Sequence, residues 1–212
     1  MKDQFLIEEG IIKGQPPSMK NEKTQYLLNI QNTCCCKIET KNIYGSGILC
    51  NIPFPDFFHL LPVLITNNHV LNAEDIKMNK EINFSLKDNM YQYKIKIDES
   101  RITYTNSTLD ITFIEIKKQD NLEINKFIGI DEGIYEGNPY KNYKGKEIYL
   151  LHYPKGYDSE FSLSEIINID PDNFRIRHKC SSEKGSSGGS LINSLNFKVI
   201  GIHKGYNDKK KI

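Results

Sequence analysis

Apolar and polar positions alternate in short runs along most of the chain after residue 33. In the segments YQYKIKID (91–98) and LDITFIEI (109–116), apolar residues recur at about every second position, which is the period of a strand with one buried face. Residues 20–31 are compatible with a short helix. The same reasoning predicts further strands at 34–41, 44–52, 61–67, 82–87, 102–105, 147–153, 161–169, 174–180, 189–192 and 197–204.

The predicted strands fall into two groups, separated by the polar, turn-rich residues 117–146. Roughly a dozen short strands joined by irregular turns are typical of a sandwich or a barrel. We therefore expect an all-β protein with two β-domains. Its expected parts are an N-terminal extension (1–32), a first β-domain (33–120), a second β-domain (121–207) and a polar tail (208–212).

The composition agrees with a β protein and narrows the expected partners. The chain of 212 residues is long enough to bury a core, and its single alanine, Ala73, disfavours a helical fold. Lys and Arg number 28 against 27 Asp and Glu, so no basic excess is available to neutralise nucleic-acid phosphates. No apolar run reaches the length needed to cross a bilayer. We expect neither a nucleic-acid nor a membrane partner.

The cysteines point to a reduced compartment. Their number is odd and three are adjacent, which is a poor framework for disulfides; they are Cys34, Cys35, Cys36, Cys50 and Cys180. The N-terminal residues carry Asp and Glu and lack the apolar run of a secretory signal. We expect a cytoplasmic location. A metal site at the adjacent cysteines would need more ligands within reach, so we expect neither a metal nor a cofactor.

Three segments carry residues suited to acyl-transfer chemistry. Ser187 lies in the glycine-rich segment 185–191, where flanking glycines allow backbone N–H groups to converge on one oxyanion. A serine hydroxyl needs a nearby base to act as a nucleophile. His69 follows an apolar strand end, and Asp110 begins an alternating strand, where a buried carboxylate needs a partner. Alone, the serine segment is equally consistent with a flexible loop, whereas the His69 segment favours a surface-loop histidine and the Asp110 segment favours a turn residue.

The three segments together resemble the chymotrypsin-like serine proteases. His69, Asp110 and Ser187 occur in that family's order, with spacings of 41 and 77 residues. Thr66 three residues before His69, the apolar alternation after Asp110 and the Gly-x-Ser-Gly-Gly segment 185–189 match the family's motifs. The resemblance covers about residues 33–206. It implies two six-stranded antiparallel β-barrels with a catalytic cleft between them, and a serine endopeptidase.

The resemblance also implies roles for individual residues. Ser187 would be the nucleophile, His69 the general base and Asp110 the residue that orients it, with the N–H groups of Gly185 and Ser187 as the oxyanion hole. Ser186 is the rival nucleophile, but only Ser187 has glycine both two residues before and one residue after it. Many digestive relatives carry at the position of Ser186 an Asp that pairs with a freed N-terminus, so activation by that ion pair is not expected here.

The segment after the nucleophile predicts a preference for acidic or amide side chains. His203 follows Ser187 by 16 residues in a Gly-Ile-His sequence similar to that of glutamyl endopeptidases and picornavirus-type proteases. The resemblance implies that His203 binds a Glu or Gln side chain before the cleaved bond, helped by the hydroxyls of Ser181 and Ser182. Gly205 would lie where substrate backbone pairs with the strand.

Two other functions remain open from the sequence. One is a binding module with a protease fold that is catalytically silent or is self-inhibited by residues 1–30 lying across the cleft. The other is an acyl hydrolase that uses the same three residues on esters. Gly205 beside His203 favours a peptidase, because it suits pairing with an extended peptide. A protein or peptide is the expected partner, and no oligomeric state is predicted.

Overall fold

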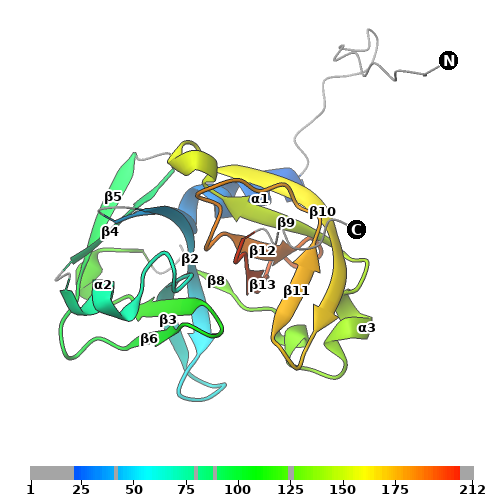
Figure 1. The fold of residues 1–212 in the computed structure, drawn as a ribbon, viewed down its shortest axis with the longest axis horizontal. Helices are drawn as coiled ribbons and strands as arrows, with labels where there is room; N and C mark the ends of the chain where they lie inside the picture. The colour runs from blue at the N-terminus through cyan, green and yellow to red at the C-terminus, as the bar shows by residue number, and fades with distance from the viewer. Residues whose placement is uncertain (1–21, 41–42, 79–80, 88–89, 124–126, 206–212) are drawn as a thin grey trace, which may run out of the picture.

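The computed structural model describes residues 22–40, 43–78, 81–87, 90–123 and 127–205. The first 21 residues of the predicted extension and the predicted tail at 208–212 lie outside the described residues. The described chain forms two curled antiparallel β-sheets that lie side by side, with helix α1 (Glu22–Thr33) packed between them (Figure 1).

The first sheet is built from the first half of the chain. Its strands, in spatial order, are β5 (Tyr91–Lys96), β4 (Glu81–Leu86), β1 (Cys35–Glu39), β2 (Tyr44–Pro53), β3 (Leu60–Thr66), β7 (Ile111–Glu115) and β6 (Thr103–Asn106). A short strand from the second half, β8 (Ile128–Gly129), pairs with β2 in parallel. This pairing ties the connection between the halves to the first sheet.

The second sheet is built from the second half of the chain. Its strands, in spatial order, are β11 (Arg175–His178), β10 (Glu160–Asp170), β9 (Glu147–His152), β12 (Ser190–Asn193) and β13 (Val199–Ile202). All twelve strands predicted from the alternation are present, and the all-β architecture of two sheets is confirmed. The twelve divide into seven and five rather than six and six, and β8 is an addition that two residues of sequence could not signal.

The helices are short and lie between strands. The predicted helix at 20–31 is α1, shifted by two residues. Its Leu27 and Ile30 are buried in a core that both sheets share, so residues 22–33 belong to the folded body. Unpredicted helical turns are α2 (Ala73–Met78), α3 (Pro139–Tyr143) and the 3-10 turns η1 (Lys118–Asp120), η3 (Glu132–Ile134) and η4 (Pro154–Gly156).

Strands β1 to β3 are buried on both faces, which explains their almost continuous apolar runs. Leu49 and Leu64 point into the core of the first sheet. Their neighbours Ile48 and Val63 point the other way, into a core shared with Leu151 and Ile192 of the second sheet, among others. Alternate residues of a strand face opposite sides, so one strand serves both cores. These strands therefore join the two halves into one packed body.

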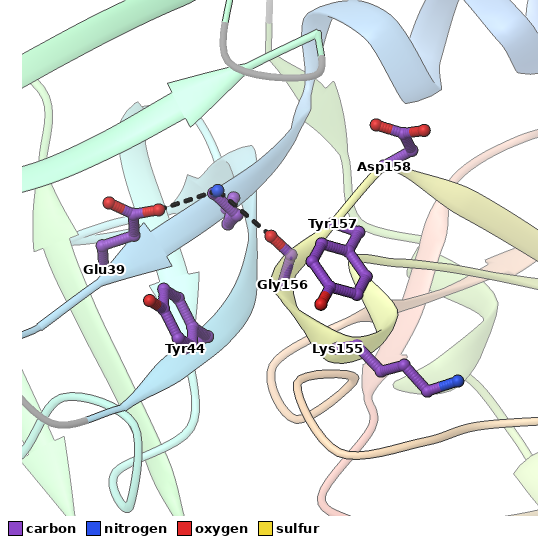
Figure 2. Close-up of a pocket in the computed structure, with 7 residues that line it drawn as sticks. Glu39, Tyr44, Lys155, Gly156, Tyr157 and Asp158 are labelled. Atoms are coloured by element: carbon purple, nitrogen blue, oxygen red, sulfur yellow. Dashed lines mark hydrogen bonds and ion pairs between the residues drawn. The ribbon is translucent and has the colours of Figure 1, made fainter.

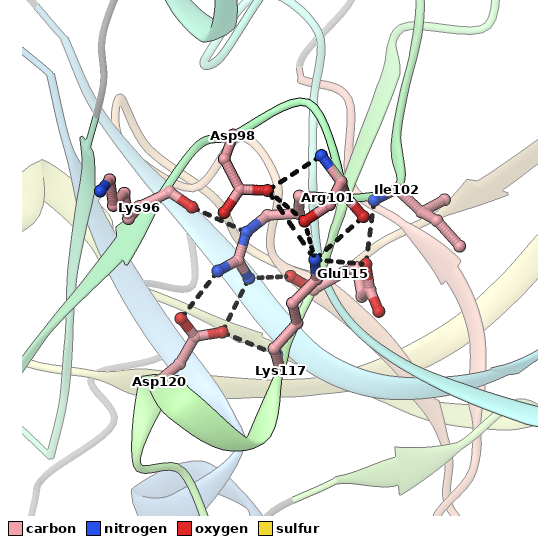
Figure 3. A network of polar contacts seen from close by, with 8 residues as sticks. Lys96, Asp98, Arg101, Ile102, Glu115, Lys117 and Asp120 are labelled. Carbon is pink, nitrogen blue, oxygen red and sulfur yellow. Dashed lines mark hydrogen bonds and ion pairs between the residues drawn. The ribbon is translucent and has the colours of Figure 1, made fainter.

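A buried ion pair fixes the chain around β7 (Figure 3). The Arg101 guanidinium donates to both carboxylate oxygens of Asp120, at 2.7 and 2.9 Å, and to the backbone carbonyls of Lys96 and Glu115. Both side chains are almost fully buried. A buried charge is tolerated when it is paired and hydrogen-bonded in this way, whereas breaking one partner away is costly. The contact anchors the two ends of the β6–β7 hairpin, whose turn carries Asp110.

No disulfide joins the five cysteines, which all lie within the described residues and are buried. Cys34 packs with Cys35 in the shared core, whereas Cys36 faces the core of the first sheet. Cys34 lies outside the alternation of the strand, because β1 begins only at Cys35. Within the part of the chain that the structure describes, no helix is long and apolar enough to span a membrane.

Candidate active site

The pairing of β3 with β7 brings His69 and Asp110 together. Thr66, at the end of β3, lies opposite Thr112, near the start of the antiparallel β7. The chain that continues to His69 and the chain that arrives through Asp110 therefore leave the sheet at the same edge. His69 Nδ1 lies 2.8 Å from Asp110 Oδ2, and the His69 backbone N–H donates to Asp110 Oδ1 at 2.9 Å.

Asp110 adopts a backbone conformation that suits this double contact. Its φ is +59°, in the left-handed region that Asp tolerates better than most residues. Asn67 holds the turn by donating its side-chain N–H to the Asp110 carbonyl at 2.9 Å. The Asp110 carboxylate is buried, whereas about half of the His69 side chain is exposed. The Nδ1 edge of the His69 imidazole is thus fixed, while the side chain remains partly open to solvent.

The pairing of β12 with β13 positions Ser187. Ser190 lies opposite Ile202, so the residues before Ser190 and those after Ile202 meet at one end of the second sheet. Gly188 donates its N–H to the His203 carbonyl at 2.9 Å, and the Ser187 hydroxyl lies 3.5 Å from the Lys204 carbonyl. The Ser187 side chain is half-buried at this edge.

Contacts between the two sheets bring the Ser187 loop against the turn that carries His69. The Ser46 N–H of β2 donates to the Ser187 carbonyl at 2.7 Å, and Thr66 donates its hydroxyl to the Ser46 carbonyl at 2.7 Å. Lys204 touches both sides: its carbonyl faces the Ser187 hydroxyl and its ammonium lies 3.8 Å from Asp110 Oδ2. His69, Asp110 and Ser187 therefore gather at one place where the two sheets meet.

The Ser187 hydroxyl and the His69 ring are not hydrogen-bonded to each other. In the described residues the Ser187 hydroxyl has only the distant Lys204 carbonyl as a partner and makes no hydrogen bond to His69. A separation of 3.5 Å is at the weak end for a hydroxyl donor. Without substrate, catalytic hydrogen bonds are often long or misaligned, and a serine side chain changes rotamer readily.

The loop before Ser187 leaves two amide groups available. Neither the Gly185 N–H nor the Ser187 N–H has an acceptor in the part of the chain that is described. Gly185 has φ +94°, and a Cβ there would lie 2.8 Å from the Tyr153 carbonyl, so only glycine fits. The Ser46 hydroxyl holds the turn by donating to the Gly185 carbonyl at 2.8 Å. Two unpaired backbone amides on one loop are the kind of donor that an oxyanion hole requires.

His203 is buried against a second histidine that the sequence did not single out. His178 Nε2 lies 3.1 Å from His203 Nδ1, and the Cys180 backbone N–H donates to His178 Nδ1 at 3.1 Å. Because the Cys180 N–H donates to Nδ1 of His178, the ring proton of a neutral His178 is on Nε2. This N–H is donated to Nδ1 of His203. The proton of a neutral His203 is then on Nε2.

Burial keeps this histidine pair neutral. Desolvation, together with repulsion from the three other histidines His178, His152 and His69, lowers the pKa of His203 to about 4. Desolvation also lowers the pKa of His178. At neutral pH His203 is therefore a neutral ring with one fixed N–H donor.

The other expected specificity residues make no hydrogen bond to the His203 side chain within the described residues. Ser181 is exposed and its N–H donates to the Ser162 hydroxyl. Among the described residues no hydrogen bond joins the hydroxyl of Ser181 or Ser182 to His203. Gly205 has φ +141° and open space around its Cα. Their roles toward substrate stay predictions.

A cavity of about 530 Å³ borders the Gly185 end of residues 185–189, the proposed nucleophile loop (Figure 2). The buried Lys37 ammonium in its wall contacts Glu39 at 2.7 Å and donates to the Gly156 carbonyl at 3.1 Å. A Cβ on Gly185 would lie 3.0 Å from Gly156 N, so the cavity adjoins the Gly185 end of the loop. The remaining lining residues are Tyr44, Lys155, Tyr157 and Asp158.

A family model described as "Trypsin-like peptidase domain" matches residues 45–202, about three quarters of the chain. The chain belongs to the trypsin-like peptidase family. The matched range contains His69, Asp110 and Ser187, and it ends at Ile202, one residue before His203. No curated protein matches this trypsin-like peptidase domain.

Solved structures with the same fold include several serine proteases. The serine endoprotease from Yersinia pestis has a TM-score of 0.61 and 16% identity; the match covers 90% of this chain and 58% of that one. The Rv3671c protease, in a form described as inactive, has a TM-score of 0.58 and 18% identity, with 84% and 81% covered. A serine-to-alanine mutant of Rv3671c from M. tuberculosis has a TM-score of 0.59 and 15% identity, with 92% and 85% covered. At these identities the likeness shows the double-barrel fold. This chain spans little more than half of the length of the Yersinia chain.

Two histidines near the site were not assigned a role from the sequence. His178 ends β11 and His152 ends β9, and each reads locally as an ordinary strand residue. Their partners, His203 and Ser186, are 25 and 34 residues away along the chain. Only the topology of the second sheet brings them together. In the described residues, no group of three or more His, Cys, Asp or Glu side chains could hold a metal ion.

Proposed function

We propose that this trypsin-like peptidase domain is a serine endopeptidase that cleaves peptide bonds after Glu or Gln. The observation that carries the proposal is the His69–Asp110 pair, held by hydrogen bonds of 2.8 and 2.9 Å beside a serine loop with two free backbone amides. This arrangement supplies a base, a residue to orient it, a nucleophile and an oxyanion site in one place.

The reaction would follow from these positions. Ser187 Oγ attacks the peptide carbonyl while His69 Nε2 removes its proton, which forms a tetrahedral intermediate; the C–N bond breaks when this intermediate collapses. Asp110 accepts the Nδ1–H of His69 and stabilises the imidazolium that forms. The amides of Gly185 and Ser187 bind the oxyanion. His69 then gives the proton to the leaving amine, and water hydrolyses the acyl-enzyme by the same route.

The preference for Glu or Gln rests on the neutral His203. With Nδ1 occupied by His178, its free donor is Nε2–H, which has no partner within the described residues. An N–H donor pairs with the amide oxygen of Gln or with the carboxylate of Glu, and offers nothing to a cationic side chain. The two ends of the nucleophile loop then take different parts of the substrate. His203 adjoins Gly188, and the cavity around Tyr44 and Gly156 adjoins Gly185.

One observation favours a second function, a catalytically silent binding module. The Ser187 hydroxyl faces the Lys204 carbonyl at 3.5 Å and not His69. In a silent module this orientation would persist when a peptide binds, and the triad would never close. The endopeptidase and the binding module therefore differ in whether Ser187 becomes nucleophilic, which a covalent probe reads directly.

Labelling by a fluorophosphonate probe tests the proposed function. We expect the wild-type chain to be labelled and Ser187→Ala to lose labelling completely, because the probe reacts only with an activated serine. Ser186→Ala is the matched control and should retain labelling at Ser187, even if more slowly. Mass spectrometry of the labelled peptide identifies the serine. Absence of labelling in the folded wild-type chain would support the silent module, and label on Ser186 would overturn the assignment.

A further inference from the structure

Ser186, directly before the proposed nucleophile, is buried and fully hydrogen-bonded. Its exposed fraction is 1%, so substrate cannot reach its hydroxyl. The Ser186 N–H donates to the Glu183 carbonyl at 3.0 Å, and its carbonyl accepts the Gly189 N–H at 2.9 Å. Its hydroxyl oxygen accepts the Glu183 N–H at 2.9 Å and lies 2.7 Å from His152 Nδ1. Through its backbone and its side chain, Ser186 thus links both ends of the turn to the sheet.

The direction of the Ser186–His152 bond follows from the proton count. A serine hydroxyl has one proton, and its oxygen can accept two. Of the two contacts that the buried Ser186 hydroxyl makes within the described residues, the Glu183 N–H can only donate, so His152 Nδ1 is the only group that can accept the hydroxyl proton. The Ser186 O–H is therefore donated to His152 Nδ1, which leaves the proton of the neutral imidazole on Nε2. Desolvation lowers the pKa of His152 to about 4, which agrees with a neutral ring that accepts at Nδ1.

His152 is a firm anchor because it ends a central strand. Strand β9 is hydrogen-bonded on one side to β10 and on the other to β12. The loop packs directly on this strand end: a Cβ on Gly189 would lie 2.9 Å from His152 Cβ and 2.8 Å from the Leu151 carbonyl. A side chain fixed in this way holds its partner to a fraction of an ångström.

We propose that His152 and Ser186 are positioning residues, which hold the Gly185 and Ser187 amides in the oxyanion-hole arrangement through a neutral hydrogen bond. The inference rests on the proposed function. The bond occupies the place where many digestive relatives use an Asp that pairs with a freed N-terminus. Here both partners lie within the folded chain, so the oxyanion hole forms on folding and needs no cleavage of the N-terminus.

Kinetics of single variants test this role. Ser186→Ala removes the bond, so the amides lose their alignment toward the oxyanion, which exists only in the transition state. We expect kcat for a peptide substrate to fall about 10- to 100-fold while KM changes less than about twofold. His152→Leu should give the same result. His152→Asn, which keeps an acceptor near the position of Nδ1, should restore much of kcat.

Ser190→Ala is the matched control. Ser190 lies three residues after Ser187, is fully buried, and its hydroxyl has no partner among the described residues. Its removal should leave kcat and KM at wild-type values. Wild-type kinetics in Ser186→Ala, with Ser187→Ala inactive, would overturn the positioning role and leave the proposed function intact. Activity retained in Ser187→Ala would instead overturn the proposed function.

A measurement on the wild-type protein keeps the inference testable if the variants fail to fold. Nitrogen-15 NMR of the histidine side chains reports which ring nitrogen carries the proton. We expect His152 at neutral pH to be protonated on Nε2 and unprotonated on Nδ1. A proton on Nδ1, or a charged ring at pH 7, would contradict the bond from Ser186 and with it the proposed anchor.

Discussion

At the scale of single residues, the site depends on which ring nitrogen of each histidine is occupied. Asp110 takes Nδ1 of His69, Cys180 and His178 fix Nδ1 of His203, and Ser186 takes Nδ1 of His152. For His69 and His203 the partner leaves Nε2 as the edge of the ring that faces the substrate in the proposed function, whereas His152 acts through its occupied Nδ1. A similar device thus serves the proposed base, the proposed specificity residue and the anchor of the nucleophile loop.

Cleavage of a peptide library tests the specificity at this scale. We expect Glu or Gln before the cleaved bond, and we expect His178→Phe to reduce kcat/KM for such substrates at least about tenfold, because His203 loses the partner that fixes its donor. His59→Phe is the control, since His59 is an exposed histidine paired only with Asp56. A wild-type preference for Arg, Lys or large aromatic residues would overturn the proposed pocket.

Sequence could identify the residues that belong to local motifs. It could not identify those whose partners lie far away along the chain. The Thr66–His69 segment and the 185–189 loop carry their signal within a few neighbours. The Gly-Ile-His segment indicates His203, and the position of Ser181 and Ser182 shortly before Ser187 indicates hydroxyls that bind the same substrate side chain, but neither segment indicates a partner for the His203 ring. The structure pairs His203 with His178, from a strand that is not even its neighbour in the sheet.

At the scale of elements, the site is a product of strand ends. Antiparallel pairing of β3 with β7, and of β12 with β13, brings four chain segments to the junction of the sheets. The alternation of apolar residues predicts these strands because each must bury one face or two. It cannot predict β8 or the helical turns α2 and α3, which contribute too few buried side chains to leave a periodic pattern.

Gly188→Ala tests how tightly the nucleophile loop is packed between the sheets. Gly188 has φ +87°, and a Cβ there would lie 1.9 Å from the Ser46 carbonyl, so the loop must move. We expect activity to be lost and the free energy of unfolding to fall by at least about 2 kcal/mol in urea denaturation. Gly137→Ala controls for backbone strain alone, because Gly137 has φ +67° with open space around it. It should cost about 1 kcal/mol. Equal losses in the two variants would contradict the packing argument.

At the scale of the whole molecule, the two sheets form one body through strands buried on both faces and through helix α1. The residues that bring Ser187 to His69 lie at this junction, since Ser46 on β2 holds the Ser187 loop. Opening the junction would therefore separate the proposed nucleophile from its base. Stability of the core and integrity of the site are coupled.

The buried histidines predict how this stability depends on pH. The pKa values of His152 and His203 are lowered to about 4 in the folded chain, whereas an unfolded histidine titrates near 6.5. Between these values the unfolded chain binds more protons, so the stability present above pH 6.5 is lost as the pH falls toward 4. Each such histidine contributes a slope of up to about 1.4 kcal/mol per pH unit. Urea denaturation of wild type and His203→Gln at several pH values measures it. The variant should show the smaller slope, and equal slopes would contradict the prediction.

The buried thiols allow local opening of the molecule to be measured through their reactivity. Burial raises the pKa of Cys34 to about 11, and also raises the pKa values of Cys36, Cys50 and Cys180, so the native protein presents almost no thiolate to solvent. A thiol reagent can reach Cys34, Cys35, Cys36 and Cys50, which are buried on or beside β1 and β2, only after the first sheet has opened. Cys35 and Cys36 on β1, with Cys34 beside them, would become reactive together when that strand detaches. The rate of alkylation at these three cysteines therefore measures how often β1, one of the strands that join the two halves, opens.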